Sequence, residues 1–146
     1  MFATKSNCYL GKPCSSDPDP KKFHTGVDIH TSAPNEVGEP VYAMEDGVVI
    51  GLDSIRKPGD VVANSVIIKG KDGYITIYSH VTPWFRPSIN DAVKQGDIIG
   101  GIDMSGKTSD PHVHVTRLAP RSDSITPQER VMKGDFTCNF LIPTTP

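Results

Sequence analysis

Short runs of alternating apolar and polar residues, separated by Gly, Pro and Asn, make up most of this chain. The clearest run is YITIYSH, residues 74–80, in which two isoleucines share one face of an extended strand and the polar residues and histidine share the other, namely Tyr74, Thr76, Tyr78 and His80. In the segment HVHV, residues 112–115, two valines alternate with His112 and His114 in the same way. The pattern predicts β-strands with one apolar face and one polar face.

Turn signals divide these runs. Two Asp-Gly pairs, at 46–47 and 72–73, lie between apolar runs and predict two hairpin turns. We expect residues 54–63 to form a loop between strands. Residues 1–22 are polar and rich in turn formers, which indicates an irregular lead-in.

The helix signal comes late, in the segment TPQERVMKGD. Thr126 is expected to cap the helix, Pro127 to occupy its first position and Glu129 to complete a capping box. Gly134 is expected to end it. The sequence thus predicts one short helix in an otherwise β chain.

Composition bounds the class of protein. A chain of 146 residues fits a single domain, which typically buries roughly 68–70% of its unfolded surface. Fifteen Lys and Arg against seventeen Asp and Glu leave a net charge of −2, so nothing favours nucleic acid or an anionic membrane as partner. No apolar stretch approaches the ~20 residues that cross a bilayer, and the first residues lack the apolar core of a signal peptide. We expect no membrane insertion.

The three cysteines leave their pairing open. A disulfide between Cys8 and Cys14 would leave Cys138 unpaired. A disulfide from Cys8 or Cys14 to Cys138 would instead link the two ends of the chain. Three reduced thiols are an equal alternative. Their spacing is not that of a zinc finger.

Four of the five histidines fall into three short segments with one aspartate, and these carry the candidate chemistry: His24 with Asp28, His80, and His112 with His114. Residues two or four apart on an extended strand point the same way, so each pair can converge on one point. Two imidazoles and a carboxylate hold zinc while leaving a position for water, which is the coordination of catalytic zinc. The sequence therefore predicts one open zinc site.

Five segments, in this order, resemble the lysostaphin-type zinc endopeptidases (the lysostaphin/LytM-type family), which cut peptides of bacterial cell-wall peptidoglycan. The match runs from about residue 23 to residue 115, and the segments are HTGVDI, PVYAMEDGVV, NSVIIKGKDGYITIYSH, VKQGDIIGGI and SGKTSDPHVHV. The resemblance implies an all-β fold: a two-sheet antiparallel β-sandwich, a duplicated hybrid motif, with a cleft over one sheet and at most one short helix near the C-terminus. It also implies a lead-in at 1–22, a metallopeptidase core at 23–120 and a C-terminal extension at 121–146.

Carried over by position, the resemblance makes His24, Asp28 and His114 the ligands of one Zn²⁺ per chain. His80 and His112 become the two non-ligand catalytic histidines. Zinc lowers the pKa of its bound water to ~7, and a base must still take the proton. No H-E-x-x-H helix supplies a glutamate, so one imidazole would orient or deprotonate the water while the other stabilises the oxyanion. Which histidine has which role stays open.

Four positions depart from the family pattern. Asn90 stands where the family often has glycine, and asparagine tolerates a positive φ. Asp103 and Asp110 also replace frequent glycines, and Thr116 stands where an acidic residue is common. These changes bear on the rim of the site and on substrate preference, and they leave the metal centre intact.

Three further residues are candidates for parts of the site. Tyr78 and Trp84 are candidates for substrate binding, with core packing as the alternative for Tyr78 and a packed surface loop for Trp84. His30 lies two residues beyond Asp28, which makes a rival ligand conceivable. We expect it instead to be a surface histidine or a neighbour of the ligands.

The function that the resemblance implies is zinc-dependent hydrolysis of the peptide cross-links of peptidoglycan by a secreted, periplasmic or cell-wall monomer, or by a phage lysin. One alternative is a non-catalytic zinc-binding domain of the same fold that binds a partner or regulates. Another is a sugar-phosphotransferase IIA domain, which has no reason to keep Asp28. The presence of both His80 and His112 favours the enzyme. Glycine bridges and D-alanyl cross-links both stay open as substrates.

Overall fold

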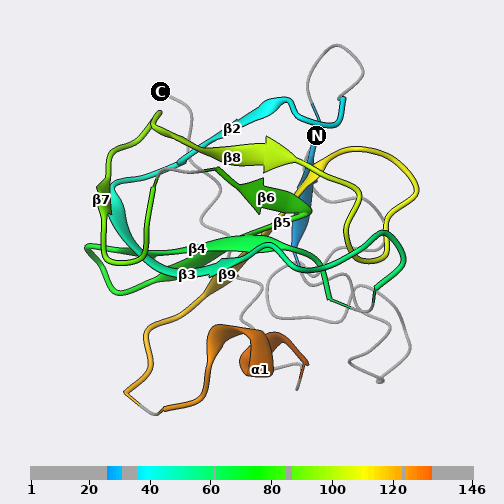
Figure 1. Cartoon of the computed structure of the whole chain (residues 1–146). Coiled ribbons are helices and arrows are strands. Elements are labelled where there is room, and N and C mark those ends of the chain that lie inside the picture. The colour runs from blue at the N-terminus through cyan, green and yellow to red at the C-terminus, as the bar shows by residue number, and fades with distance from the viewer. Residues whose placement is uncertain (1–25, 31–35, 61, 85–86, 123, 133–146) are drawn as a thin grey trace.

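The computed structural model describes residues 26–30, 36–60, 62–84, 87–122 and 124–132, and nine strands form two antiparallel sheets in this part of the chain. The larger sheet has six strands, in the order β1 (Val27–Ile29), β9 (Val113–Leu118), β5 (Ile75–Ser79), β4 (Ser65–Gly70), β3 (Gly47–Asp53) and β7 (Ala92–Val93). The smaller sheet has the order β2 (Pro40–Tyr42), β8 (Ile98–Ile102) and β6 (Val81–Pro83). Figure 1 shows the smaller sheet stacked over the larger one. The expected all-β, two-sheet architecture is confirmed.

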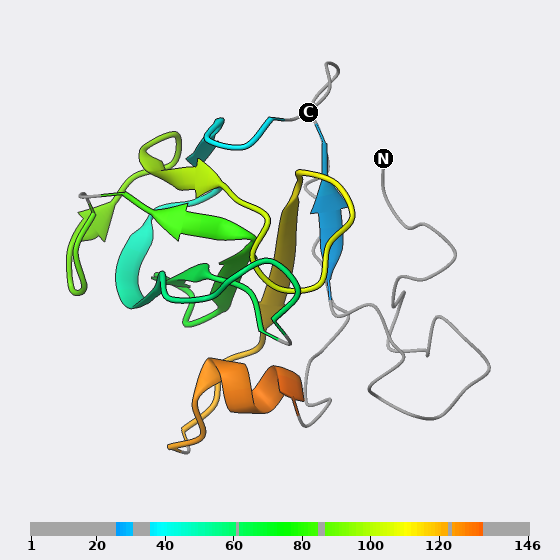
Figure 2. The same ribbon diagram turned by 45° about the vertical axis from the view of Figure 1, so that its right-hand side comes forward.

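The main core lies between the two sheets. Both sheets contribute buried aliphatic side chains to it, such as Val49 and Val66 from the larger sheet and Val41 and Ile99 from the smaller. A second, smaller cluster, made of Ile67, Ile77 and Leu118, alternates with the first and therefore lies on the outer face of the larger sheet. The helix α1 (Pro127–Met132) lies on this outer side, away from the smaller sheet (Figures 1 and 2).

The hairpin predicted at Asp72-Gly73 is present. It joins β4 to β5, and the amide of Gly70 donates to the carbonyl of Tyr74 at 2.8 Å. Gly73 has a φ of 81°, which glycine adopts without strain, and the amide of Tyr74 donates to Oδ1 of Asp72 at 3.0 Å. Local turn chemistry and sheet pairing agree here.

The hairpin predicted at Asp46-Gly47 is wrong. The preceding strand, β2, pairs with β8 in the smaller sheet, whereas β3 begins at Gly47 and pairs with β4 and β7 in the larger sheet. The chain crosses between sheets at this point. Oδ1 of Asp46 accepts a hydrogen bond from the amide of Gln95 at 2.9 Å, so its carboxylate ties the crossing to a distant turn.

The predictions for the loop at 54–63, the capping box and Asn90 agree with the structure. β3 ends at Asp53 and β4 begins at Ser65, so the loop at 54–63 is confirmed. The capping box is also confirmed, because the amide of Glu129 donates to Oγ1 of Thr126 and the amide of Thr126 donates to the Glu129 carboxylate, both at 3.2 Å. Asn90 does have a positive φ, of 71°.

Some predictions fall on other parts of the chain. The lead-in at 1–22, the three cysteines, His24 and Gly134 lie outside the described residues. Within the described ranges, no helix has the length and apolar character to span a membrane.

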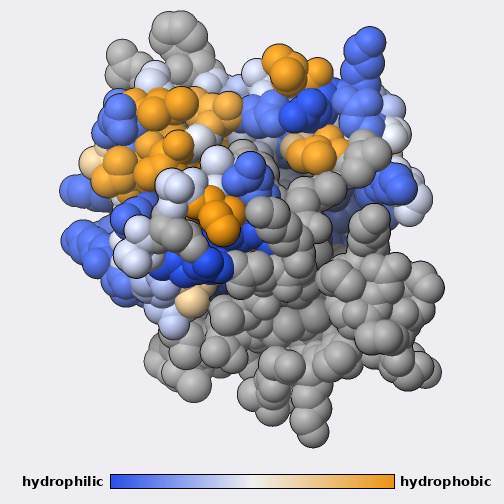
Figure 3. Space-filling model, turned by 90° about the horizontal axis from the view of Figure 1, so that it is seen from below, coloured by the Kyte–Doolittle hydropathy of each residue, from blue (hydrophilic) through white to orange (hydrophobic). Residues whose placement is uncertain are grey.

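Apolar side chains on the face seen in Figure 3 form patches bordered by polar ones, as is usual for a folded protein surface.

Candidate active site

The pairing of β1 with β9 brings Asp28 and His114 together. The two residues are direct partners across these strands, and Nδ1 of His114 donates a hydrogen bond to Oδ1 of Asp28 at 2.8 Å. His114 is 8% exposed, whereas 35% of the Asp28 side chain remains accessible. Two of the three predicted metal ligands therefore lie face to face. The third, His24, lies outside the described residues.

Gly26 allows β1 to approach β9 so closely. It is buried just before β1, and a Cβ atom added there would lie 2.8 Å from Nε2 of His114 and would overlap the carbonyl of Val115. Atoms cannot pack at such distances without displacing a strand. The glycine in the HTGVD segment is thus required by the packing of the site itself.

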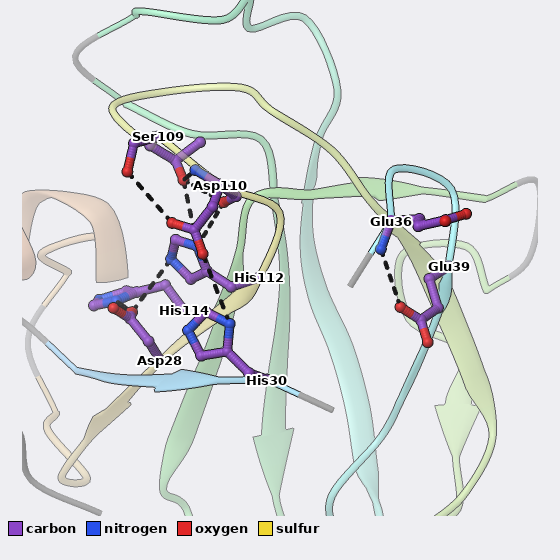
Figure 4. Close-up of polar contacts among 9 residues, drawn as sticks. Asp28, His30, Glu36, Glu39, Ser109, Asp110, His112 and His114 are labelled. Atoms are coloured by element: carbon purple, nitrogen blue, oxygen red, sulfur yellow. Dashed lines mark hydrogen bonds and ion pairs between the residues drawn. The ribbon is translucent and has the colours of Figure 1, made fainter. Parts of the chain in front are cut away.

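His112 lies beside this pair, on the same face of the larger sheet (Figure 4). Its Nε2 atom is 3.3 Å from Oδ1 of Asp28, and its Nδ1 donates to the backbone carbonyl of Asp110 at 2.9 Å. The hydrogen bond to the Asp28 carboxylate raises the pKa of His112, although burial opposes this. The prediction that His112 and His114 share a face is confirmed.

His80 joins the same group from the end of β5. Its ring centroid is 4.8 Å from that of His112 and 6.2 Å from that of His114. Its Nδ1 donates to the carbonyl of Ser105 at 2.7 Å. Burial lowers the pKa of His80, since only 8% of the residue is exposed and the charged form is poorly solvated.

The prediction that His80 shares a face with Tyr78 is wrong. His80 has a φ of 61°, which breaks the alternation of the strand, and β5 ends at Ser79. Its ring therefore joins the histidines on the outer face of the larger sheet. Tyr78 points the other way into the main core, opposite Val115.

Tyr78 and Trp84 occupy positions apart from the histidine group. The Tyr78 hydroxyl accepts a hydrogen bond from the amide of Met44 at 2.9 Å, and burial raises the pKa of Tyr78 to about 12. Tyr78 also lines an apolar pocket of about 290 Å³ that opens on the opposite face of the larger sheet from the histidines. Trp84 is partly exposed and packs against Gly101 of β8. Their roles in substrate binding stay predictions.

His30 lies at the edge of the group. Its ring centroid is 5.4 Å from that of His112, and its Nδ1 is 3.8 Å from Oδ2 of Asp110. About half of its side chain is exposed. Figure 4 shows His30 next to His112 and Asp110, as expected for a histidine that borders the site.

The donor set fits a zinc ion as far as the described residues show it. Asp28 and His114 offer a carboxylate oxygen and an imidazole, which are zinc ligands, from two paired strands. Within the described ranges, no group of three or more His, Cys, Asp or Glu side chains is arranged to hold a metal. A complete site would need a further ligand, the predicted role of His24.

Sequence reasoning misses four polar residues around His80 as parts of the site. Asn64, Thr82, Asp103 and Ser105 form a hydrogen-bonded network behind its ring. They come from three separate segments, and only Asp103 stands out in the sequence, as a departure from a glycine. The one sequence signal for this network is that polar residues stand at or near the ends of apolar runs. That signal is weak, because the sequence does not say which strands pair and so which of these residues meet.

The comparison with protein families identifies the class of this protein. The protein-family model described as Peptidase family M23 matches residues 22–127, which is more than half of the chain. The chain therefore belongs to peptidase family M23, and the resemblance to lysostaphin-type peptidases is confirmed.

Two relatives are named as endopeptidases, and the name of one of them includes peptidoglycan. The DD-carboxypeptidase/endopeptidase Mpg of Neisseria meningitidis is 34% identical over 93 residues, which cover 64% of this chain and 19% of that protein. The peptidoglycan DD-endopeptidase ShyC of Vibrio cholerae is 33% identical over 126 residues, covering 82% of this chain and 27% of that protein. The chain thus spans a fifth to a quarter of the length of these relatives.

Solved structures of relatives have the same fold. The catalytic domain of lysostaphin from Staphylococcus simulans superimposes with a TM-score of 0.56 at 26% identity, covering 70% of this chain and 71% of that one. A zinc-containing peptidase from Vibrio cholerae gives a TM-score of 0.53 at 29% identity, covering 66% of this chain and 27% of that one. Both are peptidases, in keeping with the family.

Proposed function

We propose that this chain is a zinc-dependent endopeptidase that hydrolyses peptide cross-links of bacterial cell-wall peptidoglycan. The observation that carries the proposal is the pair of His80 and His112 rings, 4.8 Å apart, beside the Asp28–His114 pair. A protein that only binds zinc needs the ligands and has no use for two further buried imidazoles. The name of the Vibrio cholerae relative, a peptidoglycan DD-endopeptidase, supports peptidoglycan as the substrate class.

Asp28, His114 and His24 would hold one Zn²⁺. When bound, zinc supplies a Lewis acid that polarises the scissile carbonyl and makes its water a nucleophile near neutral pH. The peptidase of the same fold from Vibrio cholerae contains zinc, which supports this choice of metal.

The other two histidines, His80 and His112, are each held by a hydrogen bond from Nδ1 to a backbone carbonyl. This leaves Nε2 of each ring for proton transfer. Because a carbonyl oxygen can only accept, Nδ1 of His80 carries its proton toward Ser105, and Nδ1 of His112 carries its proton toward Asp110. In each neutral ring, Nε2 is then the nitrogen with a lone pair. The ring that stays neutral can orient or deprotonate the attacking water through Nε2, and the other ring, once it also carries a proton on Nε2, can donate to the developing oxyanion.

Asp28 contacts His112 as well as His114, which links the proposed metal ligands to the proposed proton-transfer histidines. Its Oδ1 lies 3.3 Å from Nε2 of His112, so the carboxylate touches both a proposed ligand and a proposed proton carrier. The proposed site would lie on the outer face of the larger sheet, and the partly exposed side chain of Asp28 would be open to a peptide there. We infer that the chain acts as a monomer outside the cytoplasm or in the cell wall, where this substrate lies.

Digestion of purified walls tests enzyme, metal and bond together. Walls with glycine bridges and walls with D-alanyl cross-links are incubated with the zinc-loaded chain, with and without a chelator, and new amino termini are identified. We expect new termini from one wall type, their loss with chelator and their return with added zinc. If neither wall is cut, the non-catalytic zinc-binding domain becomes the better account.

A further inference from the structure

We propose that Asp103 is a positioning residue for His80, acting through the backbone carbonyl of Ser105. The inference rests on the proposed function, because it assigns Asp103 a part in that reaction. Among the described residues, the Asp103 carboxylate hydrogen-bonds Asn64, Thr82 and Ser105, and none of these is a proposed ligand. Its effect would reach the site through the chain segment that it holds.

The Asp103 carboxylate is surrounded by hydrogen-bond donors. It accepts from Oγ1 of Thr82 at 2.6 Å, from Nδ2 of Asn64 at 2.9 Å and from the amide of Ser105 at 2.8 Å, and the Ser105 hydroxyl donates to it as well. Burial alone would raise the pKa of Asp103, but the hydrogen bonds from Ser105, Thr82 and Asn64 lower it. The group is therefore a fixed anion that joins three segments of the chain.

This network holds His80 at both its ring and its backbone. The Ser105 carbonyl accepts the proton on Nδ1 of His80 at 2.7 Å, and the amide of Asp103 donates to the carbonyl of His80 at 2.8 Å. Asn64 adds two contacts, since its amide donates to the Ser105 hydroxyl at 2.8 Å and its carbonyl accepts from the amide of Val81 at 3.3 Å. The residue after His80 is thus fixed too.

The backbone of His80 needs such support. A φ of 61° is costly for a residue with a Cβ, and it persists where the surrounding structure enforces it. The same φ sends the ring to the outer face beside His112. If Asp103 released the segment after β8, the Ser105 carbonyl would move, and the ring would lose both its orientation and its preferred tautomer.

A matched control lies at the other end of the same strand. Asp97 precedes β8, as Asp103 follows it, and its carboxylate also closes a short turn, accepting from the amide of Lys94 at 2.9 Å. Asp97 is exposed. Asp97→Asn therefore removes a comparable charge from the same strand, away from the network around His80.

The test uses the full zinc-loaded chain and compares Asp103→Asn with Asp97→Asn. Zinc content, thermal midpoint, kcat and KM are measured on a peptide cross-link substrate, and ¹⁵N NMR of the histidines gives the tautomer of His80. For Asp103→Asn we expect kcat to fall about tenfold to a hundredfold, as for a misplaced reacting group. We expect KM and zinc content to stay close to wild type and the Nδ1-protonated tautomer to become less populated.

A second variant covers the case in which Asp103→Asn does not fold. Thr82→Val keeps nearly the same side-chain shape and removes one donor to Asp103. We expect a smaller fall in kcat with the same shift in tautomer, while Asp97→Asn changes neither. An unchanged kcat and tautomer in the folded variants would overturn the proposal, as would a loss of activity that follows loss of zinc.

The proposed function and this inference fail in different ways. If the wild-type chain cuts no substrate, the proposed function fails. The NMR comparison then decides the positioning role by itself, because the tautomer of His80 is measured without turnover. An unchanged tautomer in Asp103→Asn and Thr82→Val would refute that role.

Discussion

Asp28 and His114 are direct partners across β1 and β9, with Oδ1 and Nδ1 only 2.8 Å apart. They are 86 residues apart in the chain. The metal-binding chemistry proposed for this site therefore depends on the docking of one three-residue strand against β9.

Replacing the two classes of histidine should separate zinc binding from turnover. His114→Ala removes a proposed ligand, so we expect loss of both zinc and activity. His80→Ala removes a proton carrier, so we expect full zinc content with activity lower by about 10²–10⁴-fold. Metal analysis and peptide hydrolysis on the same samples provide the comparison. Loss of zinc in His80→Ala would contradict the division of roles.

Gly26→Ala should displace β1 from β9. The added methyl would overlap the Val115 carbonyl and crowd Nε2 of His114, and overpacking of this kind costs about 1–3 kcal/mol. We expect a lower free energy of unfolding together with weaker zinc binding, measured by denaturant titration and metal competition.

Gly96→Ala is the matched control for that change. Gly96 has a φ of 90° with nothing within 4 Å of an added Cβ, so the substitution strains the backbone without touching the site. It should lower the free energy of unfolding and leave zinc affinity unchanged. If both variants weaken zinc binding equally, the effect is one of general stability.

His30→Ala should leave zinc content unchanged. The His30 side chain is half exposed and borders His112 and Asp110, at the rim of the group. Metal analysis of the purified variant gives the answer. Loss of stoichiometric zinc would show that His30 is a ligand and would overturn the assignment of His24, Asp28 and His114.

Asp103 should make the stability of the fold depend on pH in the acidic range. Hydrogen bonds lower the pKa of Asp103 below its ordinary value of 3.8, so the folded state binds this proton less readily than the unfolded state. The contribution of Asp103 is complete above 3.8 and is lost as the pH falls through the lowered pKa of the folded state. Denaturant titrations of wild type and Asp103→Asn should therefore converge as the pH falls below 3.8. A difference that widens in acid would have the wrong sign.

Local sequence determined several elements of this protein. The hairpin at Asp72-Gly73 and the capping box of Thr126 and Glu129 form as predicted, because each depends on hydrogen bonds between residues a few positions apart. His112, directly before β9, and His114 in β9 also meet at Asp28, as the predicted alternation of these two residues required. In these cases the deciding contacts lie within one turn or one strand.

Only the tertiary structure decided the rest. The Asp46-Gly47 segment has the same turn chemistry as Asp72-Gly73, yet it joins two sheets, because β2 pairs with β8 more than 50 residues later in the chain. The positive φ of His80, supported by Asp103 and Ser105, moved its ring to the face opposite Tyr78. Short-range pattern therefore determined the local turns and the alternation of side chains within a regular strand. Pairing between distant strands, with the polar network that supports it, decided which of them meet, since those contacts exist only once the chain has folded.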